Sequence, residues 1–104
     1  MTAPDVLVAL TPVVESLERL GVRYLIGGSV ASSLHGVARS TLDVDIVAAL
    51  ADVHVGPLAS ALAASYYIDE SAVRDAVRRR AAFNVIHLDS MLKVDVFVLK
   101  ADPF

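Results

Sequence analysis

Residues 42–47 read Leu-Asp-Val-Asp-Ile-Val and alternate between apolar and acidic side chains. This period of two predicts a β-strand, because successive side chains of a strand point to opposite faces. Asp43 and Asp45 therefore share one face, and the apolar residues share a core face. Two carboxylates on one face repel each other unless something positive lies between them, and magnesium prefers such oxygen ligands. Taken alone, the stretch favours a solvated acidic face over a metal site.

The composition predicts a single globular domain covering residues 1–104. Hydrophobic residues make up 56% of the chain and charged residues 20%, which excludes intrinsic disorder and leaves enough apolar side chains for a core. The chain has no cysteine, which excludes disulfides, thiolate zinc sites and a cysteine nucleophile. The high apolar fraction also favours a surface that a partner covers, and it leaves a homo-oligomer open.

The charge pattern argues against DNA binding and against membrane attachment. A net charge of −3 disfavours DNA binding, because that binding relies on many Lys and Arg side chains at phosphates. The first ten residues contain Asp5 and no Lys or Arg, and no apolar run approaches the ~18 residues that span a bilayer. We therefore expect a cytoplasmic protein without sequence-specific DNA binding or a membrane partner.

The segment before this stretch predicts a helix and a strand. Thr11 and Pro12 are typical of a helix start, apolar residues recur from Val13 to Leu20, and Gly21 follows. Pro12 argues against a helix that continues from the preceding residues. Residues 22–26 predict a strand, and Ser29 is a candidate cap for a short helix over 30–34.

The segment after this stretch predicts alternating helices and strands. Pro57 is expected to begin a helix to about Ala64, and a second helix is expected over 71–80. Residues 66–68, 83–87 and 93–99 predict three strands, the last two joined by a turn at Asp89 and Ser90. The expected fold is α/β (α+β): a small mixed sheet with helices on one face and the aspartates on the open face.

A glycine turn follows the first predicted strand. Gly27 and Gly28 allow close approach of a ligand to the backbone, and free amides at a helix start suit phosphate. The turn lacks the Gly-Lys-Ser/Thr of a Walker loop, and a strand-to-helix turn with Ser29 as its cap is the alternative.

An aspartate interrupts the last predicted strand. Asp95 lies among valines, and an isolated buried carboxylate is costly, so we expect a counter-charge from Lys93 or a metal. The alternative is an edge-strand aspartate that faces water. Lys93 could neutralise a triphosphate or pair with Asp95, and Arg39 could reach a phosphate or pair with an acid of its own turn.

Together, the Gly-Gly-Ser turn, the segment Arg-Ser-Thr-Leu-Asp-Val-Asp-Ile at 39–46 and the Lys-Val-Asp of 93–95 resemble the nucleotidyltransferase superfamily that includes DNA polymerase beta. Within it, the chain looks like the minimal nucleotidyltransferases of bacterial toxin–antitoxin pairs and the AbiEii-like toxins. The resemblance covers about residues 13–104. It implies that the strand of Asp95 lies beside the strand of Asp43 and Asp45.

The resemblance also implies site roles. Ser29, after Gly27 and Gly28, would contact the outer phosphates of a nucleoside triphosphate. Asp43 and Asp45 would hold two magnesium or manganese ions, with Asp95 as the third carboxylate that helps to activate the attacking hydroxyl. The implied reaction is attack of that hydroxyl on the α-phosphate with release of pyrophosphate.

The predicted function is that of an enzyme, a metal-dependent nucleotidyltransferase. It would move a nucleoside monophosphate from ATP or another triphosphate to a protein or RNA hydroxyl, as part of a toxin–antitoxin system. The alternative is a non-catalytic nucleotide-binding or partner-binding domain of the antitoxin kind. Three acids at these positions favour the enzyme, because a structural domain has no evident reason to hold them.

Overall fold

The computed structural model describes residues 3–26 and 44–99, and this part of the chain forms an α+β domain with three helices and five strands. The elements follow one another as α1 (Ala3–Arg19), β1 (Tyr24–Ile26), β2 (Val44–Ala48), α3 (Asp52–Leu62), β3 (Tyr66–Tyr67), α4 (Glu70–Arg79), β4 (Ala82–His87) and β5 (Lys93–Val98). The predicted fold class is confirmed. The predicted helix over 30–34 lies outside the described residues.

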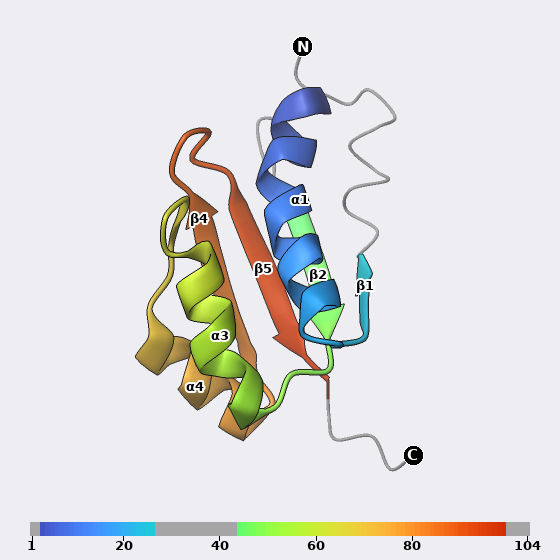
Figure 1. Ribbon diagram of the computed structural model, residues 1–104, viewed down its shortest axis with the longest axis vertical. Coiled ribbons are helices and arrows are strands. Elements are labelled where there is room, and N and C mark those ends of the chain that lie inside the picture. The colour runs from blue at the N-terminus through green and yellow to red at the C-terminus, as the bar shows by residue number, and fades with distance from the viewer. Residues whose placement is uncertain (1–2, 27–43, 100–104) are drawn as a thin grey trace.

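The five strands form one mixed sheet in the order β1-β2-β5-β4-β3 (Figure 1). The pairing of β2 with β5 is parallel, and the other three pairings are antiparallel. The strand β5 follows all the others along the described chain, yet it lies between β2 and β4. The central strand β5 thus links the antiparallel pair β1 and β2 to the antiparallel pair β4 and β3.

The core lies on a single face of this sheet. In both β2 and β5 alternate residues are buried, with Ile46 and Val94 each 0% exposed. The same core contains apolar residues of all three helices, among them Leu17 of α1, Leu58 of α3 and Val73 of α4. All the described helices therefore cover one face, as the sequence predicts, and the opposite face of the sheet stays open.

The first helix runs through a proline, which corrects the prediction of a start at Thr11. α1 spans Ala3–Arg19 with Pro12 inside it. Ala9, Val13 and Leu17 are all buried, so one apolar stripe continues on both sides of the proline. A proline inside a helix costs about 3 kcal/mol through its missing N–H and its ring. Burial of this stripe offsets that cost, and the helix continues.

The helix α3 corrects a second prediction based on proline. It begins at Asp52, five residues before Pro57. Val55 is 0% exposed, and an earlier helix start brings it into the core. The ring of His54 also accepts the backbone N–H of Ala51 at Nδ1 over 2.9 Å, which satisfies a free donor at this helix start. The remaining boundaries differ from the predictions by one or two residues.

Tyr66 connects the short strand β3 to the first helix. Its side chain is 2% exposed, and its hydroxyl donates a hydrogen bond to the backbone carbonyl of Ala9. The ring of His87 meets it edge-on, with 5.1 Å between ring centroids. Burial raises the pKa of Tyr66 to about 12. The neutral hydroxyl is thus the form that the folded chain favours.

The change Tyr66→Phe is expected to cost about 1 kcal/mol of stability at neutral pH, the typical net value of one hydrogen bond. It should also reduce the loss of folding stability at alkaline pH. In the wild type the pKa of Tyr66 is near 10 in the unfolded chain and about 12 in the folded one. Folding stability therefore falls as the pH rises through that window. Urea unfolding from pH 8 to 11.5 measures both effects. Tyr67→Phe, at a neighbouring side chain that is 59% exposed, is the control, and equal behaviour of the two variants would contradict the assignment.

Candidate functional site

Two of the predicted acids lie side by side on the open face. Asp45 of β2 and Asp95 of β5 are register partners in the parallel pairing of these strands. Both are partly exposed, whereas their chain neighbours on either side are buried in the core. Neighbouring strands are about 4.8 Å apart, so the two carboxylates project from adjacent backbone positions toward the same side. The expected placement of the Asp95 strand beside the Asp45 strand is observed.

Lys93 supplies a positive charge on the same face. Its Nζ lies 4.0 Å from Oδ1 of Asp95, and the two side chains are 43% and 24% exposed. A pair this open to water contributes about 0–1 kcal/mol. It therefore offsets part of the repulsion between the two carboxylates. Pairing with Asp95 was one of the two roles that the sequence left open for Lys93, and this contact is observed.

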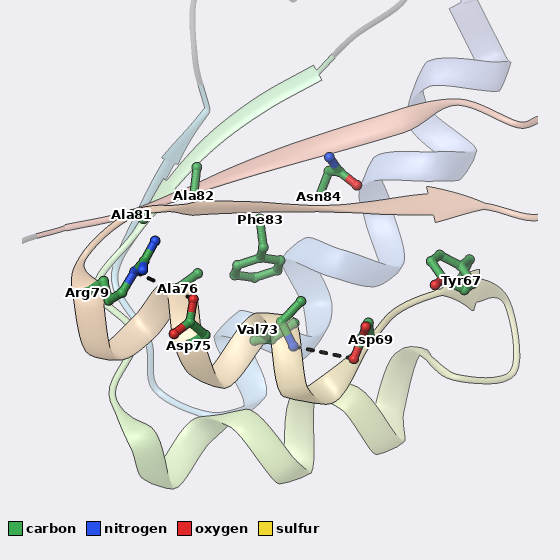
Figure 2. Close-up of a pocket in the computed structure, with 11 residues that line it drawn as sticks. Tyr67, Asp69, Val73, Asp75, Ala76, Arg79, Ala81, Ala82, Phe83 and Asn84 are labelled. Atoms are coloured by element: carbon green, nitrogen blue, oxygen red, sulfur yellow. Dashed lines mark hydrogen bonds and ion pairs between the residues drawn. The ribbon is translucent and has the colours of Figure 1, made fainter.

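Asn84 is a neighbour of this site that the sequence analysis did not select. It is the register partner of Asp95 on the other side, in β4. Figure 2 shows Asn84 and Ala82 pointing away from α4, whereas Phe83 between them points toward that helix. The alternation of β4 places Asn84 on the open face, but only the register of the β4–β5 pairing places it beside Asp95.

The other predicted site residues, Gly27, Gly28, Ser29, Arg39 and Asp43, lie outside the described residues. Over 3–26 and 44–99, no group of three or more His, Asp or Glu side chains is close enough together to hold a metal ion. The predicted carboxylate set includes Asp43, so two of its three members have a described position. Carboxylates on adjacent strands are oxygen donors of the kind that magnesium and manganese prefer.

An apolar band lies next to the acids on the open face. The registers bring Leu25, Val47 and Phe97 into one row across β1, β2 and β5, one step along the strands from the row of Asp45 and Asp95. Leu25 is 70% exposed and Phe97 45%. A hollow of about 630 Å³ lies at this end of the sheet, lined by Val22, Arg23, Tyr24, Leu25, Val47, Ala49 and Leu99. The open face thus combines charged and apolar surface.

The arginines near the end of α4 have partners within the chain. Arg74 contacts Glu70 at 2.9 Å, Arg78 contacts Asp52 at 3.5 Å, and Arg79 contacts Asp75 at 3.5 Å. These pairs are largely exposed and fit a solvated helix face that suits the helix C-terminus. They do not extend the acidic site.

Comparison with known proteins adds no relative: no family model, curated protein or solved structure matches the chain. None of the helices in the described part combines the length and apolar character needed to cross a membrane.

Proposed function

We propose that this chain is a metal-dependent nucleotidyltransferase that moves a nucleoside monophosphate from a triphosphate to a protein or RNA hydroxyl. The observation that supports it best is the register of Asp45 with Asp95 on adjacent parallel strands, on the face that no described helix covers. A protein gains little stability from two like charges placed side by side, because like charges at opposed positions of a sheet are destabilising. A functional role explains why two carboxylates occupy these neighbouring positions.

The three aspartates would bind metal, and one of them would also accept a proton. Asp45 and Asp95, together with Asp43, would hold magnesium or manganese, which when bound neutralises phosphate charge and stabilises the attacking and leaving oxygens. The acceptor oxygen forms a bond to the α-phosphorus, the bond from that phosphorus to the bridging oxygen breaks, and pyrophosphate leaves. The proton of the hydroxyl passes to the carboxylate of Asp95.

The remaining candidates would bind the triphosphate. Gly27, Gly28 and Ser29 would offer backbone amides and a hydroxyl to the outer phosphates, as the resemblance implies, and Arg39 would add positive charge. Lys93 reaches the carboxylate of Asp95 at 4.0 Å and would lie beside the bound phosphates. A toxin–antitoxin setting in the cytoplasm remains part of the proposal, with a partner protein or an RNA as acceptor.

A transfer assay tests the proposal directly. The chain is incubated with each α-³²P-labelled triphosphate, magnesium, and either total RNA or a protein extract as acceptor. We expect label in one acceptor class, identified by its sensitivity to nuclease or protease, and none without metal. Asp45→Asn should remove the labelling. Glu15→Gln, at an exposed acid of α1, is the matched control and should label like the wild type.

The proposal fails if the wild-type chain labels neither acceptor class and calorimetry shows no binding of the magnesium complexes of the four nucleotides. The second candidate is then favoured: a non-catalytic domain that binds a partner through the apolar band around Leu25 and Phe97. That role predicts partner binding that survives Asp45→Asn and is lost in Phe97→Ser.

A further inference from the structure

The strand β4 has an open edge along its first half. On one side it pairs with β5 from Ala82 to Ile86. On the other side β3 pairs with it only at Ile86 and His87. Among the described residues, no strand lies beside Ala82–Val85 on that side. Such an edge is a template for pairing with another strand.

The hydrogen bonds to β5 show which residues of β4 face outward. The N–H of Val98 donates to the carbonyl of Ala81, and the N–H of His87 donates to the carbonyl of Leu92, both at 2.9 Å. Backbone groups in an antiparallel ladder alternate between the two sides of the strand. The groups of Phe83 and Val85 therefore face β5, and those of Ala82 and Asn84 face the open edge.

A hollow of about 370 Å³ lies along this edge, between β4 and α4 (Figure 2). The helix α4 runs alongside β4 in the opposite direction, with Asp69 at one end of the hollow and Arg79 at the other. Arg79 is 70% exposed, and within the described residues its ion pair is a 3.5 Å contact to Asp75, so much of its guanidinium faces solvent. The edge therefore presents an acidic end and a basic end.

We propose that this edge pairs with the same edge of a second copy of the chain. In an antiparallel pairing about a two-fold axis at Phe83, Ala82 of one copy lies opposite Asn84 of the other. Both residues point their backbone groups outward, so each pair exchanges both of its N–H···O bonds. The two sheets become one continuous sheet, and the interface is the same patch on both copies.

Charge complementarity identifies a second copy as the occupant rather than an unrelated strand. The two-fold axis reverses α4 relative to its copy, which brings the Arg79 end of one helix to the Asp69 end of the other. The carboxylate of Asp69 accepts backbone N–H groups of Ser71 and Ala72 through Oδ1, and this leaves Oδ2 for the guanidinium. This interface is short, so we expect a dissociation constant in the micromolar range or weaker.

Sedimentation equilibrium over a wide range of protein concentration tests the proposal. The wild-type mass should rise from 11.0 kDa toward twice that value as concentration increases. Ala82→Pro removes only an outward N–H, which an edge strand tolerates, and should weaken the dimer at least tenfold. Arg79→Glu places like charges at both helix ends and should also weaken it at least tenfold. Arg78→Glu, a charge reversal on the same helix outside the hollow, is the matched control and should dimerise like the wild type.

Circular dichroism and melting of each variant show whether it is folded, and the two weakening variants provide independent tests. The proposal is overturned if the wild type remains a monomer throughout. It is equally overturned if a dimer forms and folded Arg79→Glu and Ala82→Pro leave it unchanged, because the contact then lies elsewhere, for instance at the apolar band. None of these outcomes depends on the proposed transferase activity, since Asp45 and Asp95 lie on other strands.

Discussion

Replacing Asp95 by Asn is expected to abolish nucleotidyl transfer while leaving the metal-free protein at least as stable as the wild type. The variant lacks the proposed base and one metal ligand. A loss of several kcal/mol of transition-state stabilisation lowers the rate by about 10³-fold or more. Stability should change in the other direction, because a neutral amide then replaces a carboxylate that repels Asp45, its register partner.

Thermal unfolding in a metal chelator, together with the transfer assay, measures both parts of this prediction. The ion pair with Lys93 is exposed enough that its loss costs at most about 1 kcal/mol, and relief of the repulsion from Asp45 offsets that loss. A clear drop in melting temperature with nucleotide binding retained would mean that Asp95 is a structural partner of Lys93. That result would refute the catalytic assignment.

Leu58→Ala is expected to destabilise the fold by about 2–5 kcal/mol, a large share of the roughly 5–15 kcal/mol available to a domain of this size. Leu58 is 1% exposed, and its helix α3 packs against both α1 and α4. Truncation leaves a cavity in the core, and the surrounding side chains fill it only in part. Chemical denaturation with urea gives the free energy of unfolding.

Val53→Ala, on the same helix at a side chain that is 76% exposed, is the control for that experiment. It removes methyl groups from solvent rather than from the core and also favours the helix slightly. We expect a change within about 0.5 kcal/mol. Equal losses in the two variants would mean that α3 is not anchored through Leu58.

The strands that form the centre of the sheet could be predicted from the sequence. The alternation in β2 and β5 follows from burial on one face, and β-branched residues strengthen it, so the faces of Asp45 and Asp95 were predictable. The helix starts were not predictable in the same way. Pro12 and Pro57 are typical of a helix start, and only the burial of residues that precede them, such as Ala9 and Val55, shows that the helices begin earlier.

The residues that lie beside the site could not be predicted from periodicity alone. A period of two assigns a face to Asn84, yet it gives neither the order of strands nor their register. The register of β4 with β5 depends on the loop after His87, in which Met91 adopts a positive φ of 62° that its residue type does not signal. The adjacency of Asp45 and Asp95 came from the family resemblance, because fifty residues separate them along the chain.

The position of β5 in the sheet has a consequence for how the chain folds. The strands β2 and β4 share no edge, so each can complete its ladder only when β5 inserts between them. Pairing β2 with β5 closes a loop of about fifty residues, which costs conformational entropy before any contact compensates for it. Local elements such as α4 and the β4–β5 hairpin can form early on the folding pathway. The two carboxylates meet only in the late, non-local step, so partly folded chains lack the site.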